Sequence, residues 1–79
     1  MPRRYISQIN KFGTVIYELR ENSGLTQEQL AKLCQVHVRT IGRIEKGEIA
    51  IGLETILSLA KVFKCQPSVL FEKIILKVE

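Results

Sequence analysis

The side chains with the most distinctive chemistry lie between His37 and Lys46, in the sequence HVRTIGRIEK. Arg39 and Arg43 are four residues apart, so on a helix they share one face. A guanidinium carries paired N–H donors, which match the adjacent acceptors O6 and N7 of guanine in the major groove of DNA. The stretch therefore predicts a helix that contacts base edges.

This helix is predicted over residues 38–46. Ile41 and Ile44 recur at helical spacing and indicate its inward side, to which we also assign Gly42. Gly47 is a typical helix stop. The outer face carries more cations than acids, since Glu45 is the single acid between residues 38 and 46. An α-helix with a basic outer face fits the major groove.

A second short helix is predicted over residues 27–34, directly before the first. Thr26 and Gln29 have the spacing of a capping box, in which each side chain satisfies a free backbone N–H of the first turn. The apolar residues of this segment form one narrow face, as expected for a surface helix. They are Leu30, Ala31, Leu33 and Cys34. Residues 26–47 thus predict two short helices joined by a tight turn.

The segment before this pair predicts a scaffold helix over residues 9–22. Its apolar residues repeat every three or four positions, and Gly24 follows as a left-handed stop. Arg20 lies near the helix end, where the helix dipole favours a cation. We expect it to pair with Glu45, since an unneutralised acid on a helix facing DNA would repel phosphates. The alternative is two independent surface charges.

Two more helices are predicted, over residues 53–63 and 67–76. The first is rich in apolar residues and is expected to be nearly all core; Pro67 suits the first position of the second. The last helix has apolar residues on two sides. Phe71, Ile75 and Val78 form a face that we expect to meet a second copy of the chain, because an exposed apolar face is unfavourable on a monomer.

Composition restricts the classes of function. The 79 residues are enough for one domain, residues 1–79, and the net charge of +4 favours a polyanionic partner. Common catalytic and metal-binding motifs are missing, so we expect no enzyme activity, no metal and no cofactor. The two cysteines, Cys34 and Cys65, are expected to be reduced and packed. No segment predicts a membrane span or signal peptide, so a cytoplasmic, nucleoid-associated protein is expected.

With these residues in view, the chain resembles the lambda-repressor-like helix-turn-helix domains of the Cro/C1 (XRE) type. The similarity covers about residues 9–75. It rests on the motifs LTQEQLA (residues 25–31), IGRIEKG (41–47) and LETILSLA (53–60), together with Leu19, Arg20 and Gly24. Within that family, Phe12-Gly13 and the closing LFEKII resemble the controller proteins of restriction-modification systems, small dimers that regulate their own operon.

The resemblance implies an all-α, compact five-helix domain in which the helix over 38–46 enters the major groove of double-stranded DNA. It implies base contacts from Val38, Arg39 and Arg43, and a structural salt bridge between Arg20 and Glu45. It also implies a homodimer on a pseudo-palindromic operator, acting as a transcriptional regulator. The implied contacts to the DNA backbone come from Gln27, His37, Thr40 and Lys46.

Three positions depart from the family pattern. Gln35 occupies a turn position where Gly or Asn is common, so a left-handed conformation there would cost on the order of 1 kcal/mol. His37 replaces the Ser or Thr that usually caps the helix over 38–46. Controller proteins often have Arg-Thr at the first two groove positions, where this chain has Val38-Arg39. The operator sequence is therefore left open.

Two alternatives remain. Arg3 and Arg4 beside Tyr5 form either an arm that contacts a phosphate backbone or minor groove, or a solvated terminus. The same five helices could instead serve as a protein-binding module of antitoxin or anti-repressor type, in which the last helix holds another protein. The substitutions Arg39→Ala and Arg43→Ala discriminate between DNA binding and such a protein-binding module, since only DNA binding depends on these side chains.

Overall fold

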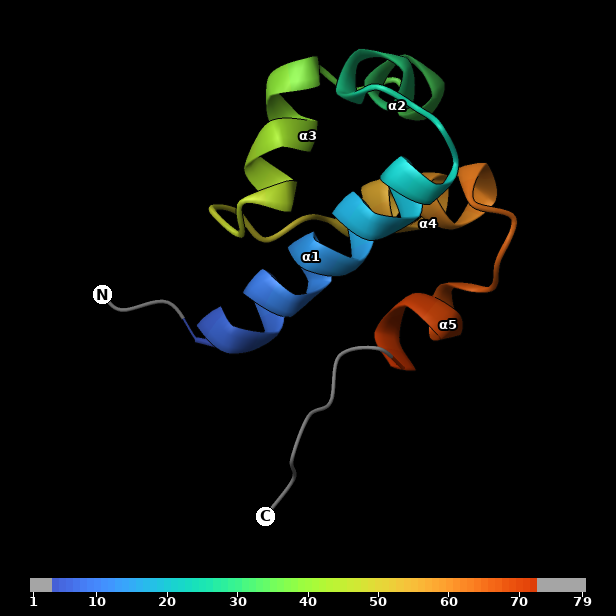
Figure 1. Ribbon diagram of the computed structural model, residues 1–79. Helices are drawn as coiled ribbons and strands as arrows, with labels where there is room; N and C mark the ends of the chain where they lie inside the picture. Colours follow the sequence, from blue (N-terminus) through green and yellow to red (C-terminus); the bar gives the residue numbers. More distant parts are fainter. Residues whose placement is uncertain (1–3, 73–79) are drawn as a thin grey trace.

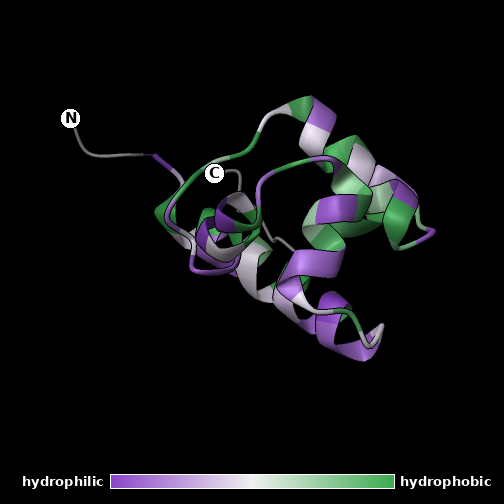
Figure 2. Ribbon diagram, turned by 90° about the horizontal axis from the view of Figure 1, so that it is seen from above, coloured by the Kyte–Doolittle hydropathy of each residue, from purple (hydrophilic) through white to green (hydrophobic). Residues whose placement is uncertain are grey.

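The computed structural model describes residues 4–72, which form five α-helices without a strand (Figure 1). This confirms the predicted all-α class. Each helix carries both hydrophilic and hydrophobic residues (Figure 2). The helices are α1 (Ile6–Asn22), α2 (Gln27–Cys34), α3 (Val38–Glu45), α4 (Leu53–Val62) and α5 (Pro67–Glu72).

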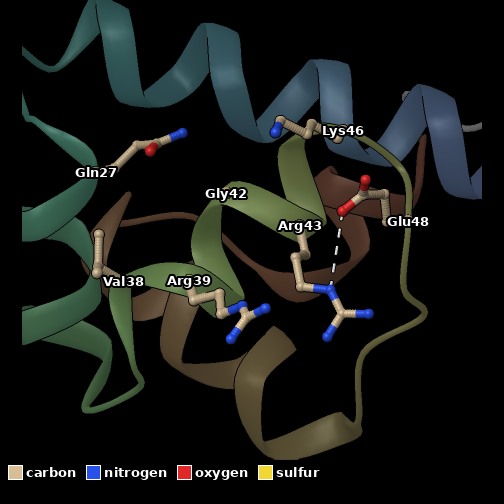
Figure 3. A pocket seen from close by; sticks show the side chains of 7 residues that line it. All are labelled: Gln27, Val38, Arg39, Gly42, Arg43, Lys46 and Glu48. Carbon is tan, nitrogen blue, oxygen red and sulfur yellow. Dashed lines mark ion pairs between the residues drawn. The ribbon is translucent and has the colours of Figure 1, made fainter.

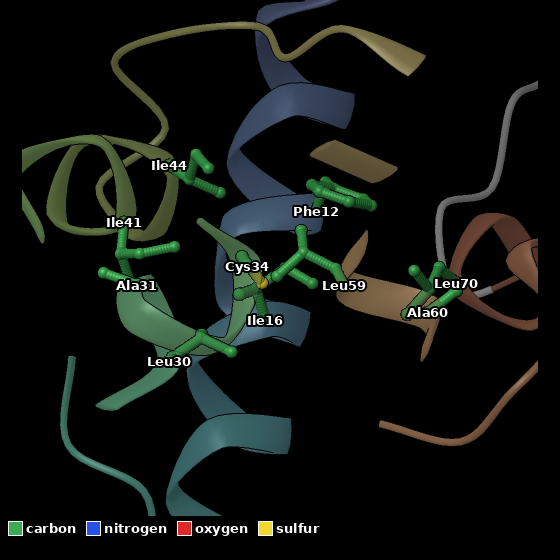
Figure 4. Close-up of a cluster of buried hydrophobic side chains, with 10 residues drawn as sticks. All are labelled: Phe12, Ile16, Leu30, Ala31, Cys34, Ile41, Ile44, Leu59, Ala60 and Leu70. Atoms are coloured by element: carbon green, nitrogen blue, oxygen red, sulfur yellow. The ribbon is translucent and has the colours of Figure 1, made fainter. Parts of the chain in front are cut away.

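The long α1 crosses the middle of the molecule, and α2 and α3 lie together at one end (Figure 1). Helix α3 packs against α1 and α2, while α5 packs against α4 and α1. Ten buried residues, drawn in Figure 4, come from all five helices and form one core. They are Phe12, Ile16, Leu30, Ala31, Cys34, Ile41, Ile44, Leu59, Ala60 and Leu70. This core fixes α3 against the scaffold and leaves its opposite face in solvent.

Some predicted helix bounds were wrong. Helix α1 begins at Ile6 rather than at residue 9, after a left-handed Tyr5 (φ 61°) that makes no side-chain cap. No capping residue precedes this start, so the sequence did not reveal it. Helices α3 and α4 each end one residue early, because Lys46 and Phe63 are their C-caps. The predicted end of α5, residue 76, lies outside the described residues.

Three leucines assigned to apolar helix faces are exposed. Leu33 is 58% exposed, Leu53 is 68% exposed and Leu57 is 48% exposed, so α4 is not nearly all core. Only Leu59 and Ala60 of α4 are buried. Helical spacing shows which apolar residues share one face of a helix, but it does not show whether a neighbouring element covers that face. Here the neighbours α2 and α5 cover one side of α4.

The connection between α2 and α3 is tight. The capping box predicted at Thr26 and Gln29 is present at the start of α2. Gln35 ends that helix in the left-handed conformation, with φ 58°, and the Val36 N–H donates to the Ala31 carbonyl at 3.0 Å. A side chain in this conformation costs on the order of 1 kcal/mol. The turn is therefore left-handed at Gln35, a position where Gly or Asn is common in the family that the sequence resembles.

Two glycines allow close contacts between α1 and α3. At Gly13 a Cβ atom would overlap the carbonyl oxygen of Ile44, so α1 and α3 meet backbone to backbone at this point. Gly47 has φ 71°, which continues α3 into the following loop, and the Glu48 N–H donates to the Arg43 carbonyl at 2.9 Å. Both glycines fix the position of α3, since neither site accepts a larger residue without rearrangement.

Both cysteines are free thiols. Cys34 is buried in the core, and burial raises the pKa of its thiol, which disfavours the reactive thiolate. Among residues 4–72 no group of three or more His, Cys, Asp or Glu side chains is placed to hold a metal ion. Across the same range, every helix is too short or too polar to cross a membrane.

Candidate nucleic-acid interface

The start of α3 is capped by a histidine. The Nδ1 atom of His37 accepts a hydrogen bond from the Arg39 backbone N–H at 3.0 Å. One ring nitrogen thus does what the oxygen of Ser or Thr does at a typical N-cap. His37 therefore caps α3 although Ser or Thr is usual at this position. The Nε2 atom of its imidazole remains available for another partner.

A buried ion pair holds the end of α3 to the scaffold. The Arg20 Nε–H donates to Glu45 Oε2 at 2.7 Å, and Nη2 donates to Oε1 at 3.2 Å. The Arg20 and Glu45 side chains are only 9% and 5% exposed. The hydrogen bond to Glu45 raises the pKa of Arg20 above its usual value. The pair predicted from the sequence is thus formed, and it is more deeply buried than two surface charges would be.

This ion pair extends to the neighbouring elements. Arg20 Nη1 donates to the Leu25 carbonyl at 2.8 Å, and the Arg20 guanidinium lies 5.3 Å from the centre of the Tyr17 ring. Gln27, the first residue of α2, donates from Nε2 to Glu45 Oε1 at 2.9 Å. One carboxylate therefore joins α1, α2 and α3.

Gln27 was expected to contact a DNA phosphate. In the structure one of its two amide hydrogens is used by Glu45, which fixes the direction of the side chain. An amide nitrogen has a second hydrogen and its oxygen is an acceptor, so the side chain keeps capacity for another partner. The link between Gln27 and Glu45 was not predicted, because nothing in either segment alone indicates it.

An open hollow of about 580 Å³ lies between the start of α2 and the outer side of α3. Figure 3 shows its lining, with the guanidinium groups of Arg39 and Arg43 next to each other and Gln27 across from them. The seven lining residues are Gln27, Val38, Arg39, Gly42, Arg43, Lys46 and Glu48. Five of these were predicted to contact DNA, and the fold brings them together.

The other two residues that were predicted to contact DNA lie on the other flank of α3. His37 and Thr40 line a smaller hollow of about 310 Å³ with Arg39, Arg43 and Ile49. The two arginines line both hollows, so they form a ridge along the exposed side of α3. A ridge of exposed cations flanked by two hollows has the shape and charge to enter a groove of a nucleic acid.

Two residues of the larger hollow were not anticipated. Gly42 was assigned to the inward side of α3, but it is half-buried and lines the hollow, with Gln27 as the nearest side chain. Glu48 lies 3.8 Å from the Arg43 Nε, and both side chains are about half exposed, at 52% and 51%. An exposed pair of this kind contributes little, so Arg43 can exchange it for another partner.

The expected dimer face is only partly described. Phe71 is 46% exposed, and its ring stacks on Phe12 of α1 with a centroid distance of 6.5 Å. Val69 on the same short helix is 37% exposed. Ile75 and Val78 of the predicted face lie outside the described residues, as does Arg3 of the predicted arm.

The helix pair, its tight turn and the cationic ridge define a helix-turn-helix protein. The chain belongs to the helix-turn-helix family HTH_3, whose model matches residues 16–70. Members of this kind are DNA-binding transcriptional regulators, and so is this chain. A search of curated proteins finds no match.

Solved structures support the same class. The restriction-modification controller protein C.AhdI from Aeromonas hydrophila is 37% identical with a TM-score of 0.79, over 82% of this chain and 98% of that chain. The controller protein C.Esp1396I is 25% identical with a TM-score of 0.75, over 98% and 100%. The clp gene regulator ClgR from Corynebacterium glutamicum, at 16% identity and a TM-score of 0.79 over 85% and 71%, shares the fold.

Proposed function

We propose that this regulator binds a pseudo-palindromic operator as a homodimer, with α3 of each copy in the major groove. The observation that carries the proposal is the ridge of Arg39 and Arg43 along the exposed side of α3, between two hollows. Each guanidinium fits the O6 and N7 acceptors of guanine, a pairing worth about 1 to 3 kcal/mol of discrimination. Val38, which lines the larger hollow, is proposed to contact a thymine methyl group.

The residues proposed to contact the DNA backbone lie on both sides of the arginine ridge. Gln27 and Lys46 lie beside the larger hollow, while His37 and Thr40 lie beside the smaller one. If α3 occupies the groove, these side chains reach the phosphates on its two sides and set the register of the protein. Such contacts release counterions, so affinity falls steeply with salt.

The dimer is proposed to form through the C-terminal helix. Support comes from the exposed Phe71 and Val69 and from an apolar hollow of about 170 Å³, which Phe71 lines together with Phe12 and Ile56. A twofold dimer presents its two α3 helices about 34 Å apart, one turn of duplex, and this spacing predicts an operator with two half-sites.

The biological role proposed is that of a controller protein of a restriction-modification system, acting in the cytoplasm on an operon of such genes. C.AhdI carries that description, and its similarity extends over 98% of its own length. Where the operator lies relative to a promoter then decides between activation and repression.

The decisive experiment is selection from random duplexes, with affinity measured over a series of salt concentrations. Wild-type protein is expected to enrich a twofold symmetric site, and Arg39→Ala/Arg43→Ala to lose it. Lys61→Ala/Lys64→Ala is the matched control, since it removes two cations outside both hollows. Equal selection by all three proteins would refute the assignment of α3 as the contacting helix.

The oligomeric state is measured on the same samples by light scattering. Phe71→Glu is expected to give a monomer with weaker operator binding, and Leu33→Glu, which changes an exposed leucine on α2, to leave a dimer. A Phe71→Glu protein that stays dimeric would exclude α5 as the interface. Binding of a single asymmetric site by wild-type monomers would exclude the dimer itself.

A further inference from the structure

Gly42 is the glycine that the fold does not explain. Of the five glycines in the chain, Gly13 is required by the contact of α1 with α3, and Gly24 and Gly47 have positive φ. Gly52 is the N-cap of α4, a position where glycine is favoured. Gly42 lies in the middle of α3, where glycine destabilises a helix relative to alanine.

The surroundings of Gly42 do not exclude a side chain. A Cβ atom built at this position has Gln27 Oε1 at 3.8 Å and Gln27 Nε2 at 3.9 Å as its nearest neighbours, which is ordinary van der Waals contact. Its φ is not among the positive values. An alanine would therefore fit the free protein and strengthen α3. Glycine at this position has no stabilising role within residues 4–72.

The place of Gly42 in the hollow gives it another role. Gly42 lies one helical turn after Val38 and one before Lys46, on the same line along α3, with Gln27 on one side and the arginine ridge on the other. Figure 3 shows it as the one lining position without a side chain. The α3 backbone therefore carries no side chain at this half-buried point, between the Gln27 amide and the arginine ridge, whose groups donate hydrogen bonds.

We propose that a base edge of the operator packs directly on the α3 backbone at Gly42. This inference rests on the proposed function and makes Gly42 a specificity-determining residue. The absent Cβ lets α3 enter the major groove more deeply, which brings the ends of Arg39 and Arg43 to the bases beside it. Glycine is the residue that allows close approach of a backbone to a ligand.

The test is Gly42→Ala, compared with wild type on the selected operator and on an unrelated duplex. The operator dissociation constant is expected to rise about tenfold or more, because a methyl group in a packed interface overfills it. Affinity for the unrelated duplex and the slope of log affinity against log salt are expected to stay unchanged, since no charge is removed. The melting temperature is expected to rise by about 2–8 °C.

Gly52→Ala is the matched control, because it adds the same methyl group at an open position outside both hollows. It should not change operator affinity. Equal operator affinity of Gly42→Ala and wild type would overturn the inference and leave the proposed function standing. An equal loss on both duplexes would place the sugar-phosphate backbone, not a base, at Gly42 and overturn it too. If wild type selects no site, the proposed function fails first.

Discussion

Removal of the Glu45 carboxylate is the sharpest test of how α3 is held. In Glu45→Ala the Arg20 guanidinium, whose side chain is 9% exposed, keeps its charge and loses the partner that is 2.7 Å away. Breaking one side of a buried pair costs about 3–5 kcal/mol. A chain of this length has about 4–12 kcal/mol of stability in total. The variant is therefore expected to lose at least a quarter of its free energy of unfolding.

The measurement is urea unfolding followed by helical circular dichroism, at one fixed protein concentration because dimerisation adds to apparent stability. Glu21→Ala is the matched control. Its carboxylate lies 3.8 Å from the same guanidinium but is 52% exposed, so its loss is expected to cost less than about 1 kcal/mol.

A double variant separates charge from packing. Replacement of both partners, as in Arg20→Met/Glu45→Leu, removes the unpaired charge and is expected to recover at least half of the stability lost in Glu45→Ala. The reasoning is refuted if Glu45→Ala and Glu21→Ala lose the same free energy of unfolding. That result would mean that solvent screens Arg20 in solution and that the pair does not fix α3.

Two further predictions concern the placement of α3. Gly13→Ala is expected to lower the free energy of unfolding by about 1–3 kcal/mol, because its Cβ overlaps the Ile44 carbonyl oxygen; thermal unfolding measures this, and a neutral result would show that α1 and α3 separate easily. His37→Ala is expected to cost about 0.5–2 kcal/mol through loss of the cap on α3, while His37→Asn retains an acceptor and most of the stability. Equal stability of the two His37 variants in urea would contradict the capping role.

The sequence predicted much of the fold because local signals were strong. The capping box at Thr26 and Gln29 gave the start of α2 at the correct residue, and Pro67 gave the start of α5. The start of α1 was missed, since Tyr5 supplies no capping side chain. Leu33 was placed on the apolar face of its helix, and the helix over residues 53–63 was expected to be nearly all core. Leu33 and Leu53 are nevertheless exposed, because a helical pattern does not show which neighbours cover it.

The candidate site divides in the same way. Periodicity was sufficient to put Arg39 and Arg43 on one exposed face, since both lie on one short helix. The hydrogen bond from Gln27 to Glu45 and the position of Gly42 depend on how α2 and α3 pack, which spacing within either helix does not determine. The Arg20–Glu45 pair was predictable despite its long sequence separation, because an isolated acid on the α3 face required a partner and the family resemblance implied the same pair.

The carboxylate of Glu45 has a consequence for the kinetics of recognition. Since it accepts hydrogen bonds from Arg20 and Gln27 at once, α3 cannot rotate against α1 without breaking a buried ion pair, or against α2 without breaking the hydrogen bond from Gln27. Helices α2 and α3 are therefore ordered before any duplex arrives, and little conformational entropy is lost when they dock. If α3 enters the groove as proposed, binding proceeds as the encounter of two preorganised surfaces, and the long side chains of Arg39 and Arg43 are the groups left to become ordered.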